Sequence, residues 1–208
     1  MTKFLTVHAQ NPQARLLAQS AQILADGGVA AIPTDSCYAL ACHLDDKPAV
    51  DHIRRLRKID ERHHLSLLCR DLSEIAAYAR VDNASYRLLR LATPGPYTFI
   101  LEATREVPRR LSHPSRKTIG IRIPDHPVAL ELLKSLGQPL IGTTLQLPGD
   151  ELPINDPEEI RERLDNELDL VIDAGPCGVE PTTVIDLSSG TPIVLRIGRG
   201  PLQPLGLA

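Results

Sequence analysis

Tryptophan is absent from this chain of 208 residues, and aromatic residues make up only 3% of it, so we expect an aliphatic core. No apolar run approaches the roughly 20 residues that a membrane-spanning helix requires. The first five residues, Met1-Thr2-Lys3-Phe4-Leu5, also lack the apolar stretch of a secretory signal. These absences predict a cytoplasmic protein without a membrane partner.

Cysteine pairs at metal-binding spacing are missing as well. The four cysteines, Cys37, Cys42, Cys69 and Cys177, form no CxxC motif, which argues against a zinc site. Without a secretion signal, a disulfide framework is not expected. We therefore predict reduced, buried, structural thiols and no protein-bound metal site.

Several common chemical signatures are also absent. The chain has no GxxxxGK(S/T) phosphate loop, no GxGxxG dinucleotide fingerprint and no GxSxG nucleophile elbow. The tandem His63-His64 has no acidic or cysteine neighbour at metal-ligand spacing, so we expect it to face solvent. Any ATP would need a less common kind of site.

The chain does contain a regular alternation of helix and strand patterns over one predicted domain, residues 1–208. Helices are expected from Asn11-Pro12 to Gly27, from Pro48, over 71–78 and 83–91, from Pro127, and from Asp156-Pro157. Strands are expected at 29–32, 65–69, 97–101, 117–123, 139–143, 168–172, 183–187 and 193–197. This order predicts an α/β (α+β) fold, a twisted open mixed sheet with helices on its faces.

Charge is unevenly distributed along the chain, although the net charge is only −3. Residues 54–70 and 105–117 are basic, whereas residues 150–173 are rich in Asp and Glu. Two basic segments in a mildly acidic protein favour a local anion site lined by both. The alternative is that these side chains only solvate helix and loop faces.

Polar residues follow several predicted strands, at the sheet edge where α/β proteins bind ligands. They form the segments 33–38, 142–149 and 180–183, although such residues also make ordinary turns. Arg122 and Arg196 lie inside strand-like apolar runs, where a charge must find a partner or face a cavity. Guanidinium groups suit carboxylate and phosphate ligands, unless these two arginines belong to edge strands and point to water.

Six motifs in this order resemble the YrdC/YciO family over nearly the whole chain, from Gln13 to Gly200. They are Pro33-Thr34-Asp35, Pro94-Gly95-Pro96-Tyr97-Thr98, Gly120-Ile121-Arg122-Ile123-Pro124-Asp125-His126-Pro127, Thr143-Thr144-Leu145-Gln146-Leu147-Pro148-Gly149, Pro181-Thr182-Thr183-Val184-Ile185-Asp186 and Val194-Leu195-Arg196. The runs 97–101 and 106–111 are most similar to the YciO branch. The resemblance implies a YrdC-like fold and the synthesis of threonylcarbamoyl-AMP and pyrophosphate from L-threonine, bicarbonate and ATP, a nucleotidyltransferase step of tRNA modification.

The same resemblance implies roles for individual residues. Thr34, Arg122 and Thr182 match the positions that bind the amino-acid substrate. The nucleotide would be bound by Arg57, Lys58, Thr144 and Arg196, and the catalytic group would be Arg57, Thr144 and Gln146. ATP would enter as a substrate, together with Mg²⁺ for which the sequence names no protein ligands.

The chain departs from the family pattern at its most charged signatures. The Lys-x-Arg signature falls on Arg57 and Ile59, the Ser-x-Asn signature becomes Thr144-x-Gln146, and a histidine position falls on Leu68. Loss of one charge-assisted donor costs on the order of 10²–10³ in rate at comparable sites. Three hypotheses follow: a weak or altered synthase, a protein that binds nucleotide, double-stranded RNA or tRNA without turnover, and a stable scaffold whose ligand site has drifted.

Overall fold

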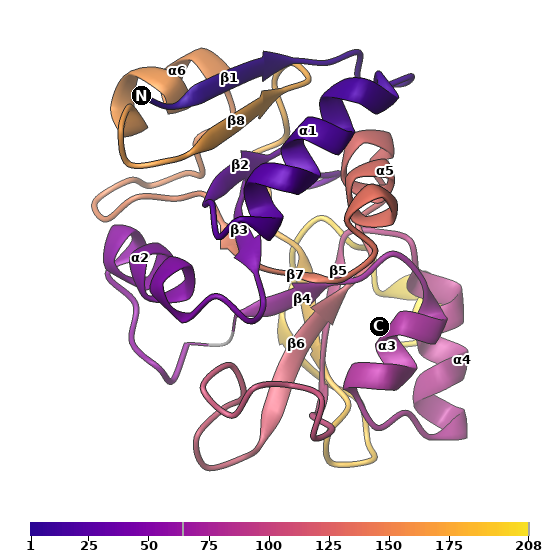
Figure 1. The fold of residues 1–208 in the computed structure, drawn as a ribbon. Coiled ribbons are helices and arrows are strands. Elements are labelled where there is room, and N and C mark those ends of the chain that lie inside the picture. Colours follow the sequence, from indigo (N-terminus) through magenta and orange to yellow (C-terminus); the bar gives the residue numbers. More distant parts are fainter. Residues whose placement is uncertain (64, 208) are drawn as a thin grey trace.

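The computed structural model describes residues 1–63 and 65–207, whose strands form one mixed sheet of ten (Figure 1). The strands are β1 (Lys3–Thr6), β2 (Ala30–Ile32), β3 (Ala39–His43), β4 (Ser66–Leu68), β5 (Tyr97–Glu102), β6 (Thr118–Arg122), β7 (Leu140–Thr144), β8 (Leu170–Asp173), β9 (Thr183–Asp186) and β10 (Ile193–Arg196). Their order across the sheet is β1-β8-β2-β3-β7-β4-β6-β5-β9-β10. The sheet contains both parallel pairs, such as β4 with β6, and antiparallel pairs, such as β3 with β7, which confirms the predicted fold class.

The helices cover both faces of this sheet. They are α1 (Ala14–Ala25), α2 (Lys47–Arg57), α3 (Leu72–Tyr78), α4 (Asn83–Ala92), α5 (Pro127–Leu136) and α6 (Pro157–Leu164), with a short 3₁₀ turn η1 (Gln203–Leu205). Successive side chains of β3 point to opposite faces of the sheet and join two different core clusters. Ala39 and Ala41 pack in a cluster with α1 and α5, whereas Leu40 and Cys42 join the larger cluster that contains α2, α3, α4 and α6.

Two predicted helix starts illustrate what local sequence can and cannot determine. Asp156 caps α6 as expected, because its side chain accepts from the Glu158 amide at 3.0 Å. The expected start at Asn11-Pro12 is wrong. The first helix begins at Ala14 without a side-chain cap, because Asn11 belongs to a preceding turn in which its amide donates to His8 Nδ1 at 3.1 Å.

The cysteines are free thiols of unequal burial. Cys37, Cys42 and Cys69 are buried, as predicted, whereas Cys177 is only half-buried in the loop after β8. Burial raises the pKa of all four thiols, which favours the protonated form. Within the part of the chain that the structure describes, none of the helices combines the length and apolar character needed to cross a bilayer.

Candidate functional site

A cavity of about 340 Å³ opens on one face of the sheet. It is the same face against which α1 and α5 pack. Small side chains keep its floor low, among them Ser66 of β4, Thr98 of β5 and Gly142 of β7. Gly120 of β6 extends this pattern, because a Cβ atom there would lie 2.8 Å from Ser66 Oγ. The floor therefore combines short polar side chains with room for a ligand above them.

Thr34, Asp35 and Arg122 form one buried corner of the site. Thr34 follows β2; its Oγ1 donates to the Cys37 carbonyl at 2.5 Å and accepts from Arg122 Nη2 at 3.2 Å. The same guanidinium nitrogen forms an ion pair with Asp35, and the two side chains are only 8% and 11% exposed. Burial lowers the pKa of Arg122, and Asp35 opposes this effect. Arg122 Nε is buried and has no hydrogen-bond partner in the described residues, so this N–H remains available to donate to a ligand.

Arg57 and the segment after β7 form a second wall. Arg57 ends α2, and its Nη1 donates to the backbone carbonyl of Gln146, while its Nε is buried and unpartnered among the described residues. Thr144 and Gln146 both line the cavity. The Gln146 amide, however, donates to the carbonyls of Asp150 at 2.9 Å and Glu151 at 3.3 Å, so it holds the following turn.

Thr182 and Arg196 close the third side. Thr182 precedes β9, and its hydroxyl lies 2.8 Å from the hydroxyl of Thr98. Arg196 donates from Nε to the Thr182 carbonyl at 3.0 Å and from Nη2 to the Thr182 hydroxyl at 3.3 Å. A register shift between Val194 and Arg196 places both Leu195 and Arg196 along the cavity, although a regular strand would point them to opposite faces.

The lining is positively charged. The arginines around it are Arg57, Arg62, Arg122 and Arg196, and no Asp or Glu side chain is among the described residues that line it. Burial, together with Arg57 and Arg54, lowers the pKa of His63, so this lining histidine is neutral at pH 7. Such a cavity favours anionic ligands with several oxygen atoms.

The predicted residues therefore divide into two groups. The cavity lining brings together Arg57, Arg122, Thr144, Gln146, Thr182 and Arg196, with Thr34 directly behind Arg122. Lys58 does not line it; this residue has φ 48° at the end of α2 and an exposed side chain. Arg62 and His63 also border the cavity. The sequence offered only a basic run as a signal for Arg62, and His63 was expected simply to face solvent, while His64 lies outside the described residues.

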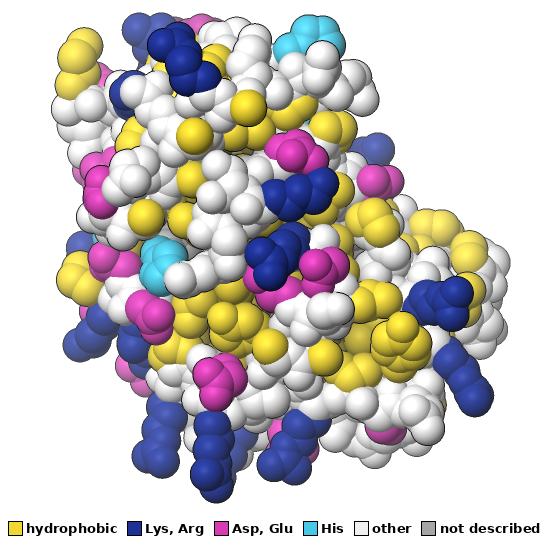
Figure 2. Space-filling view, turned by 45° about the vertical axis from the view of Figure 1, so that its right-hand side comes forward, with side chains coloured by type: hydrophobic (Ala, Val, Ile, Leu, Met, Phe, Trp, Pro, Cys, Tyr) yellow, Lys and Arg dark blue, Asp and Glu magenta, His cyan; other side chains and the backbone are white. Residues whose placement is uncertain are grey.

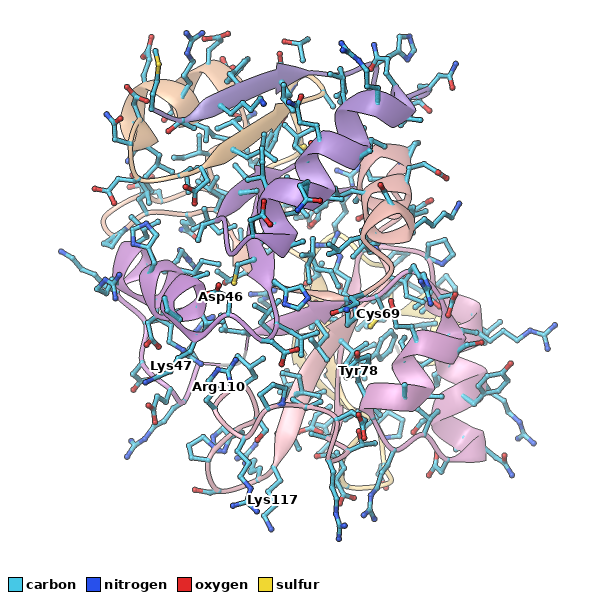
Figure 3. All side chains as sticks on the ribbon, in the orientation of Figure 1. Asp46, Lys47, Cys69, Tyr78, Arg110 and Lys117 are labelled. Carbon is cyan, nitrogen blue, oxygen red and sulfur yellow. The ribbon has the colours of Figure 1, made fainter. Side chains whose placement is uncertain are left out.

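The second basic segment lies apart from the cavity, contrary to the expectation that both segments line it. None of residues 105–117 belongs to the lining. Figure 2 shows Lys and Arg side chains projecting from the lower end of the molecule, where Figure 1 places the loop between β5 and β6. Figure 3 shows Arg110 near the beginning of α2, where its Nη2 donates to the Leu44 carbonyl at 3.0 Å, whereas Lys117 points away. The loop is thus held beside α2.

The part of the chain that the structure describes contains no cluster of side chains suited to a divalent cation. Across residues 1–63 and 65–207, no group of three or more His, Cys, Asp or Glu side chains is placed to hold a metal ion. The hydroxyls that line the cavity are weak ligands compared with carboxylates.

Comparison with known proteins gives a consistent result. A family model for Sua5, YciO and YrdC proteins, described as "Telomere recombination", matches residues 22–198. The YciO protein of Escherichia coli K12 is 50% identical over 98% of this chain and 99% of its own length. Threonylcarbamoyl-AMP synthase of Mus musculus is 34% identical over 78% of this chain and 59% of its own length.

Solved structures agree with this relationship. The crystal structure of E. coli YciO has a TM-score of 0.95 to this chain, covers 98% of it and 99% of its own chain, and is 50% identical. The structure of P. abyssi Sua5 complexed with L-threonine has a TM-score of 0.90 over 98% of this chain and 60% of its own. Since that similarity is at 24% identity, it supports the fold alone.

Proposed function

The chain belongs to the Sua5/YciO/YrdC family, and from this premise we propose that it is a threonylcarbamoyl-AMP synthase-like protein that binds ATP or AMP and L-threonine. The observation that carries the proposal is the set of four arginines around one cavity without a lining carboxylate in the described residues. The proposed reaction joins L-threonine, bicarbonate and ATP into threonylcarbamoyl-AMP and releases pyrophosphate. Its product would serve tRNA modification.

The proposed amino-acid position lies at the buried corner. Arg122 has an Nε without a partner among the described residues, which suits a carboxylate. The Thr34 hydroxyl accepts from the same guanidinium group, and Thr182 lines the same cavity. A carboxylate bound by a buried guanidinium gains charge-assisted hydrogen bonds. This arrangement would orient the amino group of the substrate for carbamate formation.

The proposed phosphate position lies toward Arg57, Thr144 and Arg196. In the adenylation step, a carbamate oxygen forms a bond to the α-phosphorus while the bond between the α-phosphorus and the bridging oxygen breaks, and pyrophosphate leaves with that electron pair. Fixed positive charge stabilises the oxygen atoms on which negative charge develops. Lys58 lies outside the lining, so we assign it only a long-range contribution to nucleotide binding.

Three departures explain why we propose a weak or altered activity. Ile59 is partly buried against the core and supplies no charge, and Leu68 is an apolar lining residue. The side-chain amide of Gln146 donates to backbone carbonyls of the turn after β7. The backbone carbonyl of Gln146 accepts a hydrogen bond from Arg57. The catalytic contribution of Gln146 would therefore be to fix Arg57 and this turn.

Pyrophosphate release tests the proposal directly. Purified protein would be incubated with L-threonine, bicarbonate and MgATP, and pyrophosphate would be measured with each substrate omitted in turn. We expect slow release that requires all three, and a fall of at least about 100-fold in Arg57→Ala. Arg87→Ala, at an exposed position of α4, is the matched control and should leave the rate unchanged. Absence of release that depends on threonine and bicarbonate would refute the synthase proposal.

A second candidate function rests on the same positive lining together with the exposed basic loop 105–117. In this alternative the protein binds a nucleotide, double-stranded RNA or tRNA without turnover. Calorimetry with ATP, with and without threonine, distinguishes the two. Threonine-dependent ATP binding supports the synthase-like function, whereas ATP binding that is indifferent to threonine, with no pyrophosphate, supports the binding function.

A further inference from the structure

The arginines that line the cavity differ in how far their donors are already engaged within the protein. Arg57, Arg122 and Arg196 each donate hydrogen bonds to neighbouring segments, which hold these guanidinium groups in place. The side chain of Arg62 forms no hydrogen bond or ion pair with any residue that the structure describes. Arg62 is exposed although it lines the cavity, so its donors lie at the cavity mouth and are available to a ligand.

The turn after α2 explains why Arg62, and not an earlier residue, lies at this mouth. Lys58 has φ 48°, and the Ile59 amide donates to the Arg54 carbonyl at 3.1 Å, which is the Schellman arrangement that ends many helices. Ile59 packs against the core, as this motif favours. Asp60 then turns the chain, since its Oδ1 accepts from the Arg62 amide at 2.9 Å. The loop therefore half-buries Ile59 and presents Arg62 to the cavity.

The size of the cavity indicates which part of a ligand would reach Arg62. A volume of about 340 Å³ is near the lower end of the range of about 300–1,000 Å³ that is typical of small-molecule sites. The proposed function requires an amino acid and a nucleotide to share this space, so the last phosphates of ATP would extend to the mouth. A guanidinium group suits that position, because its fork can bind two phosphate oxygens at once.

We propose that Arg62 binds the terminal phosphates of ATP at the cavity mouth and makes the site selective for a nucleoside triphosphate over a monophosphate. The inference rests on the proposed function, because it takes a nucleotide as the ligand and places the α-phosphate toward Arg57 and Arg196. It adds a residue that determines specificity. AMP contacts only the inner arginines, whereas ATP also contacts Arg62.

Calorimetric titration with MgATP and with AMP tests the proposal. We expect Arg62→Ala to raise the dissociation constant of MgATP about 10-fold or more and that of AMP less than about 2-fold, because charge-assisted hydrogen bonds to the terminal phosphates are lost. Arg62→Lys should have an intermediate effect, since an ammonium group keeps the charge without the fork. Equal losses of MgATP and AMP affinity in Arg62→Ala, or no loss of either, would overturn the proposal.

The matched control is Arg55→Ala. It removes the same charge from an exposed position near the end of α2 that does not line the cavity. Neither dissociation constant should change by more than about 2-fold, because an exposed charge outside the cavity acts on the ligand only through a screened field. A loss of MgATP affinity in Arg55→Ala as large as that in Arg62→Ala would show that only net charge matters, and would also overturn the proposal.

Inorganic tripolyphosphate separates failure of this inference from failure of the proposed function. It carries the phosphate chain without adenosine, and its binding requires neither threonine nor turnover. If pyrophosphate release never depends on threonine and bicarbonate, the synthase proposal is refuted, but weaker binding of tripolyphosphate to Arg62→Ala than to the wild type still supports the role of Arg62. If tripolyphosphate and MgATP bind both proteins equally, or bind neither, this role is refuted whether or not turnover occurs.

Discussion

At the scale of single residues, the Arg122–Asp35 pair is the most consequential interaction of the site. Both side chains are nearly inaccessible to solvent, and Thr34 accepts from the same guanidinium nitrogen that contacts Asp35. A buried charge is tolerated only when it is paired, so each partner constrains the other. The pair therefore fixes the guanidinium before any ligand binds.

Breaking this pair from one side should destabilise the fold. Arg122→Gln leaves the Asp35 carboxylate buried without its partner, so we expect the free energy of unfolding at pH 7 to fall by about 3–5 kcal/mol. Asp35→Asn combined with Arg122→Gln removes both charges and should recover at least half of that loss. Urea unfolding monitored by circular dichroism measures both. Equal losses in the single and double variants would show that the charge pairing is not the cause.

The sequence predicted which residues gather around the cavity better than it predicted their contacts. Thr34, Arg122, Thr182 and Arg196 come together as expected, because each is attached to the end of a strand whose place in the sheet is fixed by its apolar neighbours. The orientation of the Gln146 amide could not be predicted, since it depends on carbonyls presented by the turn at Asp150 and Glu151. These carbonyls lie only four and five residues further along the chain, but their orientation depends on how the whole turn folds.

At the scale of elements, β3 and β10 show why part of the fold was missed. β3 is the alanine-rich segment Ala39–His43, whose weak strand propensity is overcome by burial between β2 and β7. β1 was also not anticipated, because it pairs only with the distant β8. In β10 the strand was predicted, but its register shift, which places Arg196 at the cavity, was not visible in the alternation of its residues.

Gly120 provides a test of how tightly β4, β5 and β6 are packed under the site. A Cβ atom at this position would lie 2.8 Å from Ser66 Oγ, 3.2 Å from the Leu65 carbonyl and 3.3 Å from Thr98 Cγ2. We expect Gly120→Ala to lower the free energy of unfolding by about 1–3 kcal/mol, since overpacking forces neighbouring strands apart. Thermal and urea unfolding give the measurement.

The matched control for Gly120→Ala removes the nearest clashing atom. Ser66→Ala alone eliminates the hydroxyl, so the double variant Gly120→Ala with Ser66→Ala should be less destabilised than the sum of the two single changes. The Leu65 carbonyl cannot be removed in this way, so recovery should be partial. Additive effects would indicate that the backbone, and not the hydroxyl, limits the space at β6.

At the scale of the whole molecule, a net charge of −3 conceals two separate positive regions. One is the cavity lining, and the other is the exposed loop between β5 and β6, seen at the lower end of Figure 2. The loop arginines and lysine are exposed, which makes them available to a polyanion too large for a cavity of about 340 Å³. A small anion and a nucleic acid would then bind at different places on one molecule.

Charge removal from the loop separates these two possibilities. Replacement by serine of three exposed arginines, Arg105, Arg109 and Arg116, should weaken binding of duplex RNA or tRNA and leave ATP binding at the cavity unchanged. Each phosphate contact contributes roughly 0.9 to the slope of the logarithm of affinity against the logarithm of salt concentration, so we expect the slope to decrease by about 2 to 3. Fluorescence anisotropy of a labelled duplex at several salt concentrations measures this slope.

The control carries the same change of net charge at a different place. The control replaces the exposed arginines Arg15, Arg87 and Arg90, which lie on α1 and α4, by serine. This change should reduce the slope much less, because charges far from the bound RNA act on it only through a field that salt screens. Equal effects of the two triple variants would mean that RNA responds to net charge and has no defined surface here. An unchanged slope in the loop variant, with a reduced slope in Arg57→Ala, would instead place the RNA phosphates at the cavity mouth.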